Sequence, residues 1–191
     1  DVYKRQTWSD FGDVLSGRFR DRGDTAFGKR YYYIDWVNNK DTLMVNSNPE
    51  LQKGSAYRQL DVMQRINIKQ GEKIIHGFNF QLSQNNNLPR YDRLTDLSGG
   101  SLKWAEWWYK QNRLMVSYNL WINQASALYD NARIILAYQK IDQERNNRRY
   151  KNDYRTSQLE DVSVLSLNAD FTRKAGEKQN LKYGIEITSN N

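Results

Sequence analysis

Arginine, tyrosine and tryptophan side chains gather in three short segments of this chain. Arginine forms paired, charge-assisted hydrogen bonds with carboxylates and phosphates, and Trp, Tyr and Arg dominate the hot spots of protein interfaces. The three segments are therefore candidates for recognising an anionic ligand or a partner. The candidate binding residues are Arg90, Tyr91, Asp92, Arg93, Trp107, Arg145, Arg148 and Arg149.

The residue types that carry catalysis or bind metals are scarce. The chain has no cysteine, and His76 is its single histidine. No Ser-His-Asp set, no glycine-rich phosphate loop and no ligand cluster at metal spacing can be assembled from the sequence. We therefore expect no enzyme, no catalytic residue, no metal site and no cofactor. Because His76 falls within a predicted strand, we interpret it as structural and not as a haem ligand.

The elements that position the candidate residues are strands, because apolar and polar side chains alternate strictly. Between Arg113 and Asn123, one face collects Leu114, Val116, Tyr118, Leu120 and Ile122. A strand places successive side chains on opposite faces, so a period of two indicates β structure and not a helix. We interpret the aromatic segment 102–109 as the continuation of this strand.

The same alternation recurs along the chain, and its connections differ in length. Strands are predicted at 56–68, 73–83, 113–123, 131–141, 163–172 and 180–188, with a further strand end at 7–13. Short turns lie near Gly71, Ala127 and Gly176, whereas the other connections are long polar loops at 14–55, 84–101 and 142–157. A transmembrane β-barrel has this asymmetry by construction. We therefore predict an all-β fold, an antiparallel up-and-down meander that forms an open, partial segment of about seven strands of a large transmembrane β-barrel.

The composition fits the wall of a transmembrane β-barrel. Aromatic residues reach 13% although the mean hydropathy is −0.93. The longest apolar run, Ile134–Tyr138, is too short for a transmembrane helix, but a spanning strand needs only about 9–11 residues. Charged residues also fall on the predicted inner face, where a water-filled lumen tolerates them and a dry sandwich core does not. These residues are Arg133, Asp170, Lys182 and Glu186.

The net charge of +7 raises the question of a nucleic-acid partner. Lysine and arginine are scattered over nearly every segment, and no nucleic-acid-binding signature is present. We therefore expect no nucleic-acid partner, and a soluble basic β-protein that binds nucleic acid is the least favoured alternative.

Three motifs in a fixed order resemble a known family. Pro89-Arg90-Tyr91-Asp92-Arg93-Leu94 is followed by Ala105-Glu106-Trp107 and then by Ala137-Tyr138-Gln139. With residues 57–70 and 183–186, these motifs resemble the barrel of TonB-dependent outer-membrane receptors. The resemblance covers residues 56–188 and is to the haem/haemoglobin branch of Bacteroidetes type.

The resemblance implies a plugged barrel of about 22 strands in the outer membrane of a Gram-negative bacterium. It implies active uptake of haem, a haemoprotein or another iron-bearing, siderophore-like ligand. The expected partners are this ligand, outer-membrane lipid and lipopolysaccharide, and the TonB energy-coupling protein, which acts through N-terminal regions absent here. A passive porin or an adhesin-like barrel without energy coupling is the alternative.

Each group of candidate residues has a second interpretation. Asp92 can brace the neighbouring arginines within the loop instead of contacting a ligand. Residues 104–109 can form an aromatic girdle at the membrane surface. The basic cluster can bind lipopolysaccharide phosphates. This cluster comprises Arg145, Arg148, Arg149, Lys151 and Arg155, with Tyr150 and Tyr154 beside it.

Residues 1–6, Asp-Val-Tyr-Lys-Arg-Gln, resemble the in-frame translation of an adapter used in DNA library preparation. We expect these residues to be a scar that carries no fold information. Residues 7–191 are then expected to form a partial outer-membrane β-barrel domain that lacks the plug domain and the remaining strands.

Overall fold

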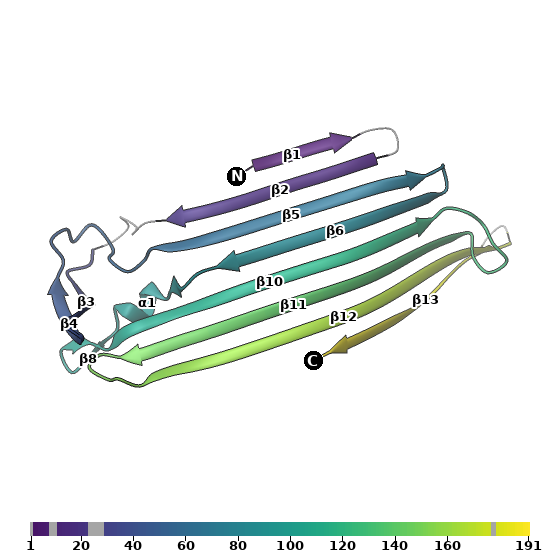
Figure 1. Cartoon of the computed structure of the whole chain (residues 1–191). Coiled ribbons are helices and arrows are strands. Elements are labelled where there is room, and N and C mark those ends of the chain that lie inside the picture. Colours follow the sequence, from purple (N-terminus) through teal and green to yellow (C-terminus); the bar gives the residue numbers. More distant parts are fainter. Residues whose placement is uncertain (1, 8–10, 23–28, 177–178) are drawn as a thin grey trace.

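One long antiparallel sheet dominates the computed structural model, which describes residues 2–7, 11–22, 29–176 and 179–191 (Figure 1). Its strands follow one another in the order β1-β2-β5-β6-β10-β11-β12-β13, and every neighbouring pair is antiparallel. The predicted all-β meander is therefore confirmed. The strands are β1 (Val2–Thr7), β2 (Phe11–Arg22), β5 (Tyr57–Gln70), β6 (Ile74–Asn85), β10 (Trp104–Ile122), β11 (Asn131–Arg149), β12 (Arg155–Ala175) and β13 (Gln179–Asn190).

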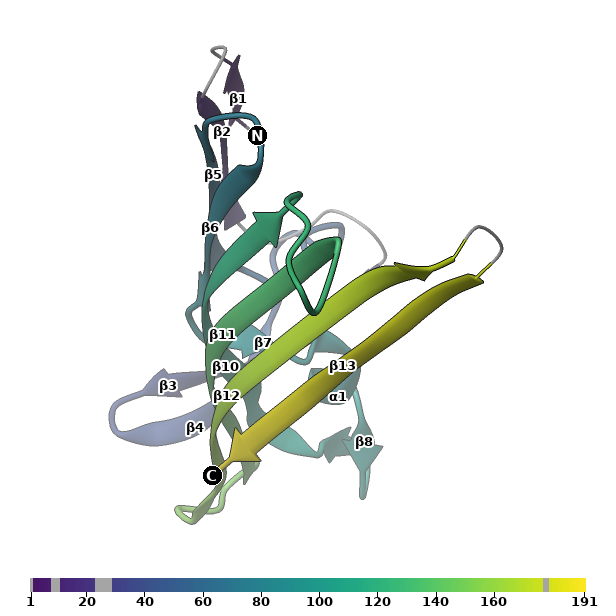
Figure 2. The same cartoon turned by 90° about the vertical axis from the view of Figure 1, so that its right-hand side faces the viewer.

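The sheet is open, with β1 at one edge and β13 at the other. Its path contains eight strands where about seven were predicted, and β1 is the additional one. The origin of residues 1–6 as an adapter scar stays a prediction. Figure 2 shows that the sheet curves and that β12 and β13 bend towards the side on which α1 (Tyr91–Leu94) and β8 (Leu97–Ser98) lie. We call this concave side the inner face and the opposite side the outer face.

The predicted turns and the predicted loops lie at opposite ends of the sheet (Figure 1), although the loop-end connection 150–154 is shorter than the turn-end connection 123–130. Gly71 and Gly176 sit in the short turns with positive φ, a conformation that glycine adopts without strain. The opposite end carries the hairpin of β3 (Tyr32–Val37) and β4 (Lys40–Val45) between β2 and β5. It also carries β7 (Leu88–Pro89), α1, β8 and β9 (Ser101–Leu102) between β6 and β10. We refer to the turn end and the loop end below.

Two predicted loops are shorter than expected. Residues 11–22 form β2, although the sequence assigned most of them to a loop. The predicted loop 142–157 is mostly strand, because β11 continues to Arg149 and β12 begins at Arg155. Charged side chains did not end these strands, since the ladder of backbone hydrogen bonds continues where both faces meet water. The aromatic segment belongs to β10, as predicted.

The predicted alternation is visible from β5 to β13. One row of paired residues on the outer face reads Ile66, Phe78, Tyr118, Leu136, Leu167 and Ile187. The adjacent row, on the inner face, reads Arg65, Asn79, Ser117, Ala137, Ser166 and Thr188. The outer row faces solvent instead of a dry core, and Ile185 in the neighbouring row is 55% exposed.

No helix among the described residues is long and apolar enough to cross a membrane.

Candidate functional site

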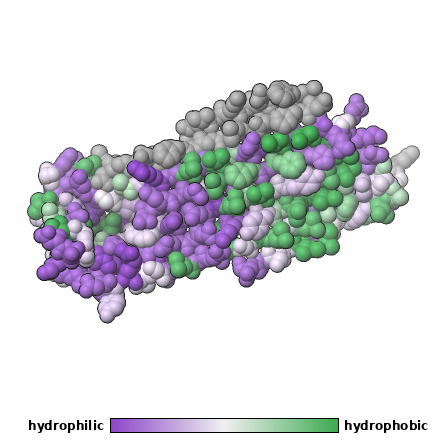
Figure 3. All heavy atoms as spheres, viewed as in Figure 1, coloured by the Kyte–Doolittle hydropathy of each residue, from purple (hydrophilic) through white to green (hydrophobic). Residues whose placement is uncertain are grey.

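An apolar band covers the turn-end half of the outer face (Figure 3). In β10 it runs from Leu114 to Ile122, the nine residues that match the roughly 9–11 needed to span a bilayer. Towards the loop end, the next outward-facing residue of each strand is polar. These residues are Arg58, Gln84, Asn112, Lys140, Ser163 and Ser189. Lys140 pairs there with Asp142 at 3.5 Å and with Asp161 at 3.2 Å.

The loop-end edge of this band runs obliquely to the strands. The apolar residues before the first polar outward position are Leu60, Leu82, Leu114, Tyr138, Leu165 and Ile187, in β5, β6, β10, β11, β12 and β13. Leu82 pairs with Val62, two residues below Leu60, and Tyr138 pairs with Val116, two residues below Leu114. Ile187 pairs with Leu167, two residues below Leu165. The other neighbouring pairs are level, so the edge descends by six residues over five strand-to-strand steps.

This slope gives the direction of the band relative to the strands. With about 3.4 Å per residue and about 4.8 Å between strands, it corresponds to an angle of about 40°. Strands of transmembrane barrels tilt by about 35–45° from the membrane normal. A flat apolar layer that crosses strands tilted in this way is therefore encoded in the positions of the apolar residues.

Histidine and tyrosine side chains form hydrogen bonds at the turn end of the band. His76 is on the outer face, where Nδ1 lies 2.8 Å from the Tyr118 hydroxyl and Nε2 lies 2.8 Å from Gln70 Oε1. The Tyr183 hydroxyl donates to the Leu128 carbonyl, and its ring stacks on Phe171 with centroids 5.3 Å apart. The two contacts of His76 link β6 to β5 and β10, and its structural role stays a prediction.

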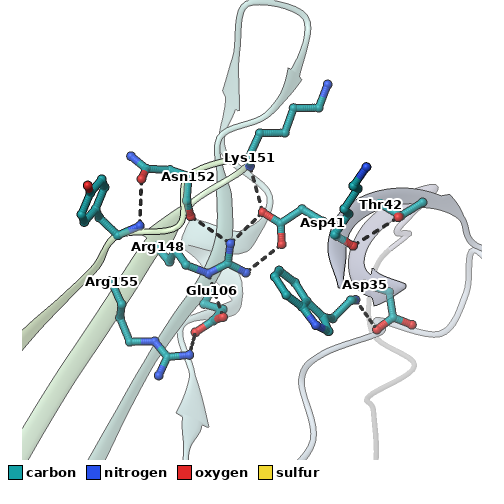
Figure 4. A network of polar contacts seen from close by, with 11 residues as sticks. Asp35, Asp41, Thr42, Glu106, Arg148, Lys151, Asn152 and Arg155 are labelled. Atoms are coloured by element: carbon teal, nitrogen blue, oxygen red, sulfur yellow. Dashed lines mark hydrogen bonds and ion pairs between the residues drawn. The ribbon is translucent and has the colours of Figure 1, made fainter. Parts of the chain in front are cut away.

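The predicted basic cluster is divided between the two faces, and Arg148 is its buried member. Its side chain, 8% exposed, makes a two-pronged ion pair with Asp41 of β4, with both N–O distances 2.7 Å (Figure 4). It also donates to Glu106 at 2.9 Å and to the Asn152 carbonyl at 3.0 Å, and it lies over the Trp36 ring. The guanidinium thus attaches the β3–β4 hairpin to the loop ends of β10 and β11.

The ionisation of this ion pair follows from its surroundings. Burial acts to raise the pKa of Asp41, but hydrogen bonds from Arg148 and from the Lys151 amide outweigh it and leave the pKa below its usual range. Hydrogen bonding to Asp41 raises the pKa of Arg148. Both groups therefore stay charged at neutral pH. Arg155 completes the network through Glu106, at 2.6 Å.

The segment around α1 forms a second braced structure. Arg90 donates to both Asp92 carboxylate oxygens, at 2.9 and 2.7 Å, and this contact holds the pKa of Asp92 below its usual range. Arg93 lies 5.4 Å from the centroid of the Trp107 ring, and Arg30 lies 5.2 Å from that of Tyr91. Asp92 therefore braces its neighbours, as the second interpretation of this segment expected.

A groove of about 390 Å³ opens at the loop end, chiefly on the inner face. It brings together three of the predicted binding residues: Arg90, Trp107 and Arg145. Of the remaining candidates, Tyr91, Asp92, Arg93, Arg148 and Arg149 do not line it. The groove is completed by Trp108 and Tyr109, which belong to the predicted aromatic segment, and by residues that the sequence did not single out, namely Gln143, Asn147 and Gln158.

The aromatic residues 104–109 lie beyond the apolar band. Trp108 is on the outer face of β10, six residues before Leu114 and towards the loop end. In an extended strand this corresponds to about 20 Å. A register shift between Trp104 and Glu106 brings Trp104 against Trp107, with ring centroids 4.4 Å apart. This placement favours recognition at the loop end over a girdle that borders the band.

Family models, curated proteins and solved structures were compared with this chain, and none matches it.

Proposed function

We propose that this chain forms part of the wall of a transmembrane β-barrel in the outer membrane of a Gram-negative bacterium. In this proposal the barrel belongs to a TonB-dependent receptor for active uptake of haem, a haemoprotein or another iron-bearing ligand. The oblique apolar band carries the barrel assignment. The three ordered motifs that resemble this receptor family carry the finer assignment.

The band supports a membrane location because its height and its slope agree with one bilayer. Its length of nine residues in β10 suits one crossing. Its slope suits strands tilted as in known barrels. A β-sandwich has no reason to step its apolar edge steadily in one direction from strand to strand. A flat membrane crossing a tilted sheet requires such a step.

The inner face supports a water-lined lumen. Arg133 and Asp170 are paired residues in β11 and β12, and Lys182 and Glu186 lie on the same face of β13. Arg113 donates to Gln139 at 3.1 Å on this face. Charges and amides at this density are stable next to water and costly in a dry core.

The open edges support closure by further strands. Within lipid, every backbone N–H and C=O must find a partner, so neither edge of the barrel segment can face hydrocarbon unpaired. In the proposed receptor, more strands of the same barrel pair with both edges.

Uptake tests the receptor proposal against the passive barrel. The complete gene product that carries this chain is expressed in a haem-auxotrophic host without its own haem receptors, with and without the TonB protein. We expect growth on haem only when TonB is present. Growth in both strains points to a passive porin. Absence of growth in both, with the protein inserted in the outer membrane, contradicts haem uptake.

A further inference from the structure

We infer that the loop-end groove binds the negatively charged end of a flat, aromatic ligand, with Arg145 as its main anion contact. The inference rests on the proposed function in one respect, because it takes the inner face to be the lumen. It goes beyond that proposal by naming the contact residues and the chemical group they recognise.

The charge of the groove is positive and only partly offset. No Asp or Glu is among its lining residues. The positive charge of Arg90 is shared with Asp92. Among the described residues, Arg145 makes no ion pair, and Glu160 is the nearest carboxylate along the inner face of β12. Arg145 is therefore the cation in the groove that has no carboxylate to neutralise it.

Arg145 is nevertheless held in position. With the Gln143 amide oriented so that its oxygen faces the guanidinium, this oxygen accepts from Arg145 Nε at 2.8 Å and from Nη2 at 2.9 Å. Nη1 has no hydrogen-bond acceptor among the described residues and is free to donate to a ligand. A neutral partner fixes the side chain without cancelling its charge. This arrangement lowers the entropic cost of binding an anion.

The aromatic wall of the groove is also fixed before a ligand binds. The Trp107 ring is packed by Trp104 at 4.4 Å and covered by Arg93 at 5.4 Å. Tyr109 follows on the same face and is paired with Arg145 in the register of β10 and β11. Two aromatic side chains beside an arginine suit a ligand with a flat ring body and a carboxylate or phosphate. The volume of about 390 Å³ lies within the range of small-molecule sites.

The test uses two ligands that share the same macrocycle and differ at the two propionate groups: metal-free protoporphyrin IX and its uncharged dimethyl ester. Binding to the complete gene product in detergent micelles is followed by quenching of tryptophan fluorescence. We expect the free acid to bind more tightly than the ester. Arg145→Gln should weaken binding of the acid on the order of tenfold or more and leave the ester unchanged. Arg145→Lys keeps the charge but loses the paired N–H donors of the guanidinium, so its affinity for the acid should be intermediate.

Arg173→Gln is the control, because Arg173 lies near the turn end of β12, at the opposite end of the sheet from the groove. It should bind both porphyrins as the unmodified protein does. Equal affinity for acid and ester, or an unchanged affinity in Arg145→Gln, overturns the inference. Protease protection of the same samples in membranes reports on the barrel separately. Binding at the groove without TonB-dependent growth would overturn the uptake proposal and leave the groove assignment intact.

Discussion

The turn-end and loop-end halves of this sheet share the same strands but face different surroundings. In the turn-end half, the outer face is apolar and the inner face polar. In the loop-end half polar side chains predominate on both faces, apart from the aromatic residues of β10 and Leu159, and Arg148, Asp41 and Glu106 form a charged network there. The backbone ladder of β11 and β12 continues through both halves. Pairing between strands thus depends on backbone hydrogen bonds, whereas in the proposed barrel the side chains of each half match the solvent that this half meets.

A charge placed in the band should have the largest effect. Leu167 and Leu159 both lie on the outer face of β12, the first in the middle of the band and the second beyond it, 75% exposed. We expect Leu167→Arg to destabilise the inserted protein by about 2–4 kcal/mol, as for basic residues at the bilayer midplane. Unfolding by urea in lipid vesicles measures this.

Leu159→Arg is the matched control and should change stability by less than about 0.5 kcal/mol. Equal costs for the two variants would remove the contrast between the halves.

The loop-end network should respond next. Asp41→Asn keeps the shape of the side chain but removes the charge that faces Arg148. We expect the docked hairpin to lose stability on the order of 1–3 kcal/mol, since the buried Arg148 cation loses its best hydrogen-bond acceptor. Faster proteolysis within residues 31–45, with the rest of the sheet still protected, is the expected readout.

Lys29→Gln, which removes the exposed ion pair with Glu50, is the control and should leave proteolysis unchanged. Release of the hairpin in both variants would show that Arg148 is not its anchor.

A packing change on the inner face should have a smaller effect. A Cβ atom added to Gly77 would lie 2.7 Å from Trp121 Cζ3 and 2.9 Å from Cη2. Because the Trp121 ring is bulky and lies under Arg133, we expect Gly77→Ala to cost about 1–2 kcal/mol in urea unfolding. A Cβ atom added to Gly71 has no other atom within 4 Å, so the cost of Gly71→Ala in stability should come from its positive φ alone. A neutral Gly77→Ala would mean that the Trp121 side chain moves freely on the inner face.

Lowering the pH should have the smallest effect, because near neutral pH it leaves the attachment of the loop-end hairpin unchanged. The pKa of Asp41 is lowered in the folded protein, so its contribution is complete above the ordinary Asp range and is lost as pH falls through the lowered value. Protease resistance of the hairpin should therefore be flat from pH 7 to about 5 and decline only below about pH 4. A decline near pH 6 would indicate that a different group controls docking.

The sequence predicted the turn-end half better than the loop-end half, for a physical reason. In the band, one face must be apolar, so Leu114, Val116 and Tyr118 repeat with a period of two and reveal the strand. Beyond the band neither face needs apolar residues, and residues 142–149 were assigned to a loop although they continue β11. Asp41 and Arg148 meet across 107 residues of sequence, and no local pattern announces such a contact.

Only some of the residues that line the groove were predicted as binding residues. Arg90, Trp107 and Arg145 were candidates by residue type alone. Continuing the alternation of β11 would also have placed Gln143, Arg145 and Asn147 on one face. The amide groups of the groove carry no charge that marks them in the sequence, so only the register of β10, β11 and β12 brings them together.

The most direct test of the account is the depth of two residues on one hydrogen-bonded row. Leu60 of β5 connects through paired Gln84, Asn112 and Asp142 to Asp161 of β12, all on the outer face. Strands tilted by about 40° place Asp161 about 12 Å nearer the loop-side water than Leu60. The chain has no cysteine, so Leu60→Cys and Asp161→Cys can each carry a single spin label. The account predicts that in outer membranes the label at 60 is accessible to oxygen dissolved in lipid and the label at 161 to a water-soluble nickel complex. Equal accessibility of both labels to the nickel complex would contradict it.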